Sequence, residues 1–290
     1  MQDTGFEVLE WTSDDGLVLR CRDYPGRMDR PPILCIPGLT RNARDFEPVV
    51  DALAGEWRVL CVDLRGRGQS DYARDSASYM PMRYVADIAA LLEQAELERV
   101  VAIGTSLGGI VTMLLAAMQL ERFAGAVLND IGPEIEETGL ARIRDYVGQG
   151  RSFPTWMHAA RALREQAGEA HPDHAIADWL RMAKRLMCVG AGGRIVFDYD
   201  MKIAEPFAAP PAGEAPDLWP LLRALSGRPV LVLRGELSDI LSGATLDRMA
   251  REVPGLEAVT VPRTGHAPTL EEPIAQQAIS RLLARVAEAG

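Results

Sequence analysis

The sequence predicts an α/β protein whose mostly parallel sheet is covered by helices on both faces. Short apolar runs alternate with segments of helical spacing over residues 6–128 and again over residues 229–289. The apolar runs are continuous rather than alternating with polar residues, which indicates strands that are buried on both faces. We therefore expect a core domain made of residues 1–133 and 216–290. Residues 134–215, which show helical spacing and no strong strand signal, form a helical segment inserted between two strands.

The first part of the core begins with a hairpin and continues as alternating strands and helices. Ser13-Asp14-Asp15-Gly16 separates two apolar stretches, a pattern typical of a β-hairpin. A helix is predicted where apolar residues fall on one face at helical spacing. In chain order we expect strands at Phe6–Trp11, Leu17–Cys21, Ile33–Ile36 and Val59–Val62, with helices at Asp45–Ala54 and Tyr84–Ala95.

The most informative stretch of the chain is Gly104-Thr105-Ser106-Leu107-Gly108-Gly109. It follows the apolar run Val100–Ile103 and leads into Ile110–Met118, which predicts a strand, a sharp turn and a helix. A turn this tight forces Ser106 into a strained backbone conformation and leaves room only for very small residues beside it. The hydroxyl then lies at the N-terminus of a helix, where developing negative charge is stabilised. This setting predicts a nucleophilic serine.

The remaining core elements lie on both sides of the inserted segment. We expect strands at Ala126–Leu128, Pro229–Leu233 and Ala258–Val261, helices at Thr245–Val253 and Glu271–Ala289, and a linker at Pro206–Pro216. The aromatic residues and methionines of the insertion are expected mostly as helix–helix core: Tyr146, Phe153, Trp156, Met157, Trp179, Met182 and Met187. Its histidines, His158, His171 and His174, are expected at the surface.

Composition limits the class of protein. The chain has 290 residues, 48% of them hydrophobic, and a net charge of −10, which argues against a nucleic-acid surface. It shows no signal peptide pattern and no apolar run of membrane-spanning length, so we expect a soluble cytoplasmic protein. The sequence does not decide whether the protein forms homo-oligomers. Four scattered cysteines indicate buried free thiols: Cys21, Cys35, Cys61 and Cys188.

A serine nucleophile needs a base, and the base needs a group that orients it. His266 is the one histidine in a loop after a sheet strand, where parallel sheets present catalytic groups. Asp239, in the turn after Pro229–Leu233, is our choice for the third member. Asp130 and Glu236 are the alternatives. The order Ser106, Asp239, His266 is nucleophile, acid, base.

Acyl transfer also requires donors for the oxyanion. The backbone N–H groups of Leu107 and Leu39 are the candidates. The segment Asp63–Ser70 is interpreted as a structural turn in which Asp63 and Arg65 form an ion pair. The sequence contains no dinucleotide fingerprint, P-loop, H-E-x-x-H or metal-ligand cluster, so no cofactor and no metal is predicted.

These motifs together resemble the α/β-hydrolase superfamily over essentially the whole chain. The residues that carry the resemblance are Pro37–Thr40, Asp63–Ser70, Gly104–Gly109, Gly235–Asp239 and Thr264–His266. The resemblance implies an eight-stranded, mostly parallel sheet with a helical cap, or lid, inserted after the sixth strand. It also implies that the cap covers the active site and lines the substrate pocket. A serine at the elbow disfavours the haloalkane dehalogenases and epoxide hydrolases, which are similar but have an aspartate there.

The expected function is that of a serine carboxylesterase. A Ser-His-Asp triad would cleave a small, largely apolar carboxylic ester or lactone through an acyl-enzyme intermediate. Three alternatives remain: a C–C bond hydrolase or enol-lactonase of aromatic-compound degradation, an acyltransferase, and a ligand-sensing or partner-binding module on the same fold. No nucleic-acid or membrane partner is expected.

Overall fold

The fold is seen in a computed structural model, which describes residues 5–208 and 216–289. Eight strands form one sheet in the order β1-β2-β4-β3-β5-β6-β10-β11. The strands are β1 (Glu7–Thr12), β2 (Val18–Tyr24), β3 (Ile33–Ile36), β4 (Val59–Asp63), β5 (Val100–Thr105), β6 (Phe123–Asn129), β10 (Val230–Gly235) and β11 (Glu257–Val261). β2 pairs antiparallel with β1 and β4, and the other neighbours are parallel. The predicted eight-stranded, mostly parallel sheet is confirmed.

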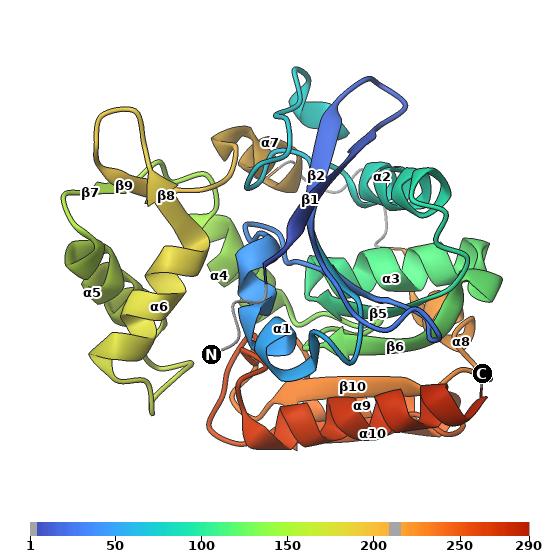
Figure 1. Cartoon of the computed structure of the whole chain (residues 1–290). Coiled ribbons are helices and arrows are strands. Elements are labelled where there is room, and N and C mark those ends of the chain that lie inside the picture. The colour runs from blue at the N-terminus through green and yellow to red at the C-terminus, as the bar shows by residue number, and fades with distance from the viewer. Residues whose placement is uncertain (1–4, 209–215, 290) are drawn as a thin grey trace.

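Helices cover both faces of the sheet, as predicted. One face packs against α2 (Pro81–Gln94), α3 (Leu107–Met118), α8 (Trp219–Arg223) and α9 (Gly243–Glu252), and the other against α1 (Glu47–Leu53) and α10 (Pro273–Ala289). Figure 1 shows α10 in red along its face and α3 on the opposite side of β5. The four central parallel strands β3, β4, β5 and β6 are buried along their whole length apart from Thr105. Continuous apolar runs therefore became strands because both of their faces are covered.

Between β6 and α8 the chain forms an inserted segment, whose helices α5 and α6 and short strands stand apart from the large sheet (Figure 1). Its elements are α4 (Glu137–Tyr146), β7 (Ser152–Phe153), α5 (Trp156–Ala167), α6 (Ile176–Leu186), β8 (Met187–Val189), β9 (Ile195–Phe197) and α7 (Ala204–Ala208). The sequence shows no strong strand signal here, yet β7, β9 and β8 form a small antiparallel sheet beside the helices. Strands of two or three residues are too short to show a periodic pattern. The predicted linker lies partly outside the described residues.

Most of the large apolar side chains of this segment form a separate core. Phe153, Trp179, Met182 and Met187 are buried together there, as expected. Met157 is exposed instead. β8 and β9 are joined by the exposed turn 191–193, in which Gly193 has a φ of +71°.

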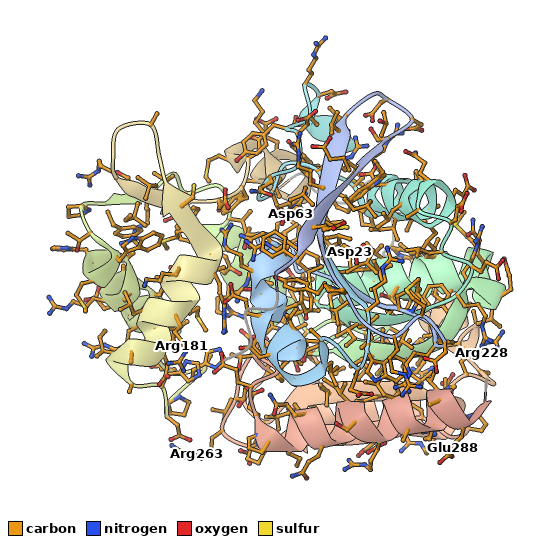
Figure 2. All side chains as sticks on the ribbon, viewed as in Figure 1. Asp23, Asp63, Arg181, Arg228, Arg263 and Glu288 are labelled. Atoms are coloured by element: carbon orange, nitrogen blue, oxygen red, sulfur yellow. The ribbon has the colours of Figure 1, made fainter. Side chains whose placement is uncertain are left out.

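Ion pairs attach the inserted segment to the core. Arg44, in the 3-10 turn η1 (Ala43–Phe46) before α1, holds Asp198 just after β9 at 2.6 Å. Arg263, in the loop after β11, pairs with Asp173 on the turn between α5 and α6 at 2.6 Å. Arg263 and Arg181 of α6 lie on the same side of the molecule in Figure 2. These two ion pairs join the inserted segment to loops that follow β3 and β11.

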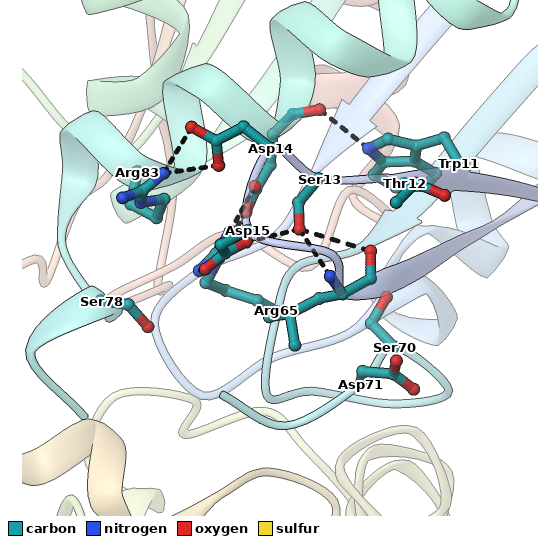
Figure 3. A network of polar contacts seen from close by, with 12 residues as sticks. Trp11, Thr12, Ser13, Asp14, Asp15, Arg65, Ser70, Asp71, Ser78 and Arg83 are labelled. Carbon is teal, nitrogen blue, oxygen red and sulfur yellow. Dashed lines mark hydrogen bonds and ion pairs between the residues drawn. The ribbon is translucent and has the colours of Figure 1, made fainter. Parts of the chain in front are cut away.

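The turn after β4 is fixed by a buried arginine. Arg65 is fully buried and binds Asp87 of α2 at 2.6 Å and Asp15 of the hairpin turn at 2.8 Å. Figure 3 shows the hairpin turn around Arg65, with Arg83 of α2 bound to Asp14 beside it. The expected ion pair between Asp63 and Arg65 is wrong. The carboxylate of Asp63 instead accepts from two backbone amides, and Arg65 reaches away to α2 and the hairpin.

Candidate active site

Ser106 occupies the turn between β5 and α3. Its φ is +52° and its ψ is −117°, so a residue with a side chain is held in a region that normally favours glycine. Its backbone N–H donates to the carbonyl of Asn129 at 2.9 Å, which ties the turn to the end of β6. The predicted strained turn is confirmed.

The glycines that flank the serine are required by close backbone contacts. A Cβ atom on Gly104 would lie 2.4 Å from the carbonyl oxygen of Gly108. A Cβ atom on Gly108 would lie 2.0 Å from the carbonyl oxygen of Ile36 at the end of β3. Both distances are far below a normal van der Waals contact. The G-x-S-x-G spacing therefore follows from the packing of α3 against β5 and β3.

His266 reaches the serine from the loop after β11. Its Nε2 lies 2.9 Å from Oγ of Ser106, and its side chain is 9% exposed. The loop is held on both sides of the histidine. The N–H of Gly265 donates to the carbonyl of Ala170 in the inserted segment at 2.6 Å, and the side-chain amide of Asn129 donates to the carbonyl of Pro268 at 2.9 Å.

The choice of Asp239 as the partner of His266 is wrong, because Asp130 occupies that place. Oδ2 of Asp130 lies 2.7 Å from Nδ1 of His266. Asp130 directly follows β6, the strand beside β5, and its backbone is in the left-handed region with a φ of +57°. It is fully buried, and it also accepts from the N–H of Gly235 at 2.8 Å and from Oγ of Ser238 at 2.6 Å. These donors satisfy a buried carboxylate, which would otherwise be costly.

Asp239 has a different partner. Arg142 of α4 binds both of its carboxylate oxygens, at 2.5 Å and 2.8 Å. Burial raises the pKa of Asp239, but the hydrogen bonds and charge of Arg142 outweigh it and lower the pKa of that carboxyl. The remaining alternative, Glu236, accepts from the N–H of Arg263 at 2.7 Å. Asp239 is thus bound by an arginine of the inserted segment, whereas the imidazole is bound by Asp130.

The two amides predicted as oxyanion donors lie beside the serine. Leu107 is the first residue of α3, and Leu39 belongs to the loop after β3. A Cβ atom added to Gly38, the residue before Leu39, would lie 3.6 Å from Cβ of Ser106. Within the described part of the chain, neither N–H is paired with an acceptor. Both are thus available to an oxygen atom bound at the serine.

Sequence reasoning missed the role of Arg67 in this loop. Nε and Nη2 of Arg67 both donate to the carbonyl oxygen of Leu39, at 2.9 Å and 2.8 Å. Arg67 itself is fully buried. The pair of bonds fixes the carbonyl of Leu39, a residue that lines the cavity over Ser106. In the sequence, the only sign of this contact is that the turn after β4 contains two arginines, Arg65 and Arg67.

A cavity of about 540 Å³ opens over Ser106 and His266. It is bounded by the core loop 38–41, by the loop 266–270, and by α4, α5 and α6. His171 lines this cavity and is 6% exposed, so the expectation that it lies at the surface is wrong. His158 is exposed, as expected.

All four cysteines are free thiols. Cys21, Cys35 and Cys61 are buried free thiols, as expected, and Cys188 is half-buried and free. Among residues 5–208 and 216–289, no cluster of His, Cys, Asp or Glu could hold a metal ion. In the same residues, none of the helices has both the length and the apolar character that crossing a membrane requires.

Comparison with known proteins agrees with this architecture. Residues 33–278 match the model of the alpha/beta hydrolase family. The chain is 35% identical to a 3-hydroxybutyrate-oligomer hydrolase of Cupriavidus necator over 86% of each chain. It is 29% identical to a 2-(acetamidomethylene)succinate hydrolase of Mesorhizobium japonicum over 81% of each. A crystal structure of an alpha/beta hydrolase from Novosphingobium aromaticivorans is 62% identical, with a TM-score of 0.93 over 97% of this chain and 99% of that one. The protein belongs to the alpha/beta hydrolase family.

Proposed function

We propose that this protein is a serine hydrolase that cleaves a small carboxylic ester or lactone. One observation carries the proposal. An unbroken series of hydrogen bonds runs from Oγ of Ser106 to Nε2 of His266 and from Nδ1 of His266 to Asp130. A carboxylate can only accept, so Nδ1 carries the proton and Nε2 is free to accept the proton of the serine.

In the first half of the reaction Ser106 attacks the ester carbonyl. His266 takes the hydroxyl proton as the C–O bond forms, and then donates it to the oxygen of the leaving alcohol. Asp130 keeps the imidazole in the required tautomer and stabilises the imidazolium cation. The product of this half is an ester between the substrate acyl group and Ser106.

The charge that develops on the carbonyl oxygen needs donors that are already in position. The N–H groups of Leu39 and Leu107 are the proposed pair. The bonds from Arg67 to the carbonyl of Leu39 support this assignment, because they fix the loop before the substrate binds.

In the second half a water molecule enters from the cavity. His266 accepts a proton from this water, whose oxygen attacks the acyl-enzyme, and returns the proton to Oγ of Ser106 as the acid departs. The inserted segment, proposed as the cap, supplies three of the walls around this step through α4, α5 and α6.

The nature of the substrate is supported by the relatives and by the size of the cavity. The Cupriavidus necator relative is named for an oligomer of 3-hydroxybutyrate, which is an ester of a short hydroxy acid. A cavity of about 540 Å³ falls in the range that holds small molecules. Short-chain esters of hydroxy acids are therefore the first substrates to test.

The test combines covalent labelling with a substrate panel. A fluorophosphonate should label the peptide that contains Ser106. Ethyl esters from C2 to C12, small lactones, 3-hydroxybutyrate dimers and 2-(acetamidomethylene)succinate should then be assayed with wild type and Ser106→Ala. We expect the variant to lose turnover on the order of 10⁵-fold or more.

Ser280→Ala is the matched control, because Ser280 is an exposed serine of α10. It should keep wild-type rates. If Ser106→Ala hydrolysed the preferred ester as fast as wild type, the proposal would be wrong.

A further inference from the structure

His171 is a buried polar side chain in the active-site cavity that the proposed reaction does not use. It lies on the turn between α5 and α6 and is 6% exposed. Its ring stacks on that of His174, with the centroids 4.6 Å apart, and meets Trp179 edge-on. Neither ring nitrogen of His171 has a hydrogen-bond partner within residues 5–208 and 216–289. Because His171 lines the cavity, its unpaired ring nitrogens are open to a bound ligand.

The imidazole of His171 is neutral. Burial lowers its pKa to about 3, and the positive charge of Arg41 acts in the same direction. A neutral imidazole offers one N–H donor and one acceptor and needs no buried counter-charge. Arg41 lines the same cavity as this ring.

Arg41 lines the cavity next to the nucleophile. A Cβ atom added to Gly38 would lie 3.3 Å from Cγ of Arg41 and 3.6 Å from Cβ of Ser106. Arg41 and Ser106 therefore flank the same glycine. Nε of Arg41 donates to Asp45 at 2.5 Å, whereas Nη1 and Nη2 bond to none of the described residues. The open edge of a guanidinium is well suited to a carboxylate, which it can bind through two parallel N–H groups.

The other arginines of the cavity are engaged or solvated. Arg142 is bound through two bonds by Asp239, and Arg185 is held between Glu47 and Glu271. Arg151 has no carboxylate partner in the described chain, but it is an exposed residue of the cavity lining, so water screens its charge. Arg41 is therefore the partly buried cation with donors to spare near Ser106.

We infer that Arg41 and His171 form a carboxylate subsite, so that the substrate is an ester that also carries a free carboxylate. This inference rests on the proposed function, because it places the carboxylate relative to the ester bound at Ser106. The N–H of His171 and the Nη edge of Arg41 hold the carboxylate oxygens, while Asp45 remains on the Nε edge. A neutral ester of the same shape leaves both groups without a partner, as they are without substrate.

Binding to the Ser106→Ala protein tests the subsite without requiring turnover. Calorimetric titrations compare monomethyl glutarate and 4-acetoxybutanoate with the neutral isostere methyl 5-methylhexanoate. The first two ligands place the carboxylate in the acyl part and in the leaving alcohol respectively. We expect at least one charged ester to bind ten or more times more tightly than the isostere.

Two substitutions in the same background then identify the residues. Arg41→Met should weaken the charged ester by about ten- to a hundredfold, and His171→Phe, which keeps an aromatic ring against His174 and Trp179, by about tenfold. The controls Arg281→Met on α10 and His158→Phe on α5 should keep the preference for the charged ester.

Equal binding of charged and neutral esters by Ser106→Ala, which carries both subsite residues, would overturn the inference. So would a preference that survives both Arg41→Met and His171→Phe. Turnover of the same ligands by wild type tests the proposed function separately. If the Ser106→Ala protein binds the charged ester selectively but wild type hydrolyses none of the esters, the subsite inference is supported and the proposed function is contradicted.

Discussion

Two aspartates at the ends of neighbouring strands have different tasks in this protein, and their partners decide which task each has. Asp130 is enclosed and accepts from the backbone, from Ser238 and from His266. Asp239 is a third exposed at its side chain and is bound by Arg142. Only the first can orient the imidazole without giving up an existing ion pair.

This difference gives a prediction for a pair of matched variants. Asp130→Asn should lower kcat about 10⁴-fold, because an amide in this place no longer imposes the tautomer in which Nε2 accepts from Ser106. Asp239→Asn should change kcat by less than about fivefold. Steady-state rates on the preferred ester, with circular dichroism to confirm folding, measure both. A larger loss in Asp239→Asn than in Asp130→Asn would reverse the assignment.

At the scale of elements, Arg65 joins three parts of the chain that are distant in sequence. It belongs to the turn after β4 and binds the β1–β2 hairpin turn through Asp15 and helix α2 through Asp87. Burial raises the pKa of Asp87, and its bonds to Arg65 oppose that rise. The carboxylate of Asp87 is 1% exposed and depends on this arginine to remain charged.

Arg65→Met should therefore lower the free energy of unfolding by about 3–5 kcal/mol, since it leaves Asp87 buried without a cation. Arg83→Met removes the exposed pair with Asp14 and should change stability by less than about 1 kcal/mol. Urea unfolding followed by tryptophan fluorescence compares the two. Equal losses would mean that Arg65 contributes no more than a surface arginine does.

At the scale of the whole molecule, the free cysteines report whether the core is closed. Cys21, Cys35 and Cys61 lie in β2, β3 and β4, and each is at most 2% exposed. Burial and the nearby carboxylate of Asp198 raise the pKa of Cys188 to about 11. A thiol with that pKa is ionised in about one molecule in a thousand at pH 8.

We expect native protein to react slowly with a thiol reagent at pH 8, at Cys188 alone, and denatured protein to react at all four cysteines. The native rate should rise about tenfold per pH unit between pH 7 and 10, because thiolate is the reactive form and its fraction increases up to the pKa. Cys188→Ser should abolish the native reaction. Rapid labelling of Cys35 or Cys61 in native protein would contradict the closed core.

Much of the fold could be predicted from the sequence because the patterns that indicate each strand and helix are local. The strand at Ile33–Ile36 has the predicted bounds, since an apolar run is delimited by the prolines on either side. The turn at Ser106 could be predicted for the same reason, because the glycines that its close backbone contacts require lie within two residues of the serine. Helices and parallel strands of this core are specified within a few residues of chain.

The parts that could not be predicted depend on partners far away in sequence. Asp130 and Asp239 each follow a strand, and their partners, His266 for the first and Arg142 for the second, come from distant parts of the chain. His171 stacks on His174 and lines the cavity that the inserted segment helps to enclose. No apolar pattern in the sequence marks this position as buried. A two-residue strand such as β7 exists only because β9 pairs with it.

The position of the inserted segment in the chain has a practical consequence. Ser106 and Asp130 precede it, whereas His266 follows it, and the β8–β9 turn at 191–193 is exposed. Cleavage at that turn would yield two pieces, one with Ser106 and Asp130 and the other with His266. Under the proposed mechanism neither piece alone hydrolyses an ester, so hydrolysis would report fragment complementation. Fusing each piece to one of two interacting proteins would then make an enzymatic sensor of their association.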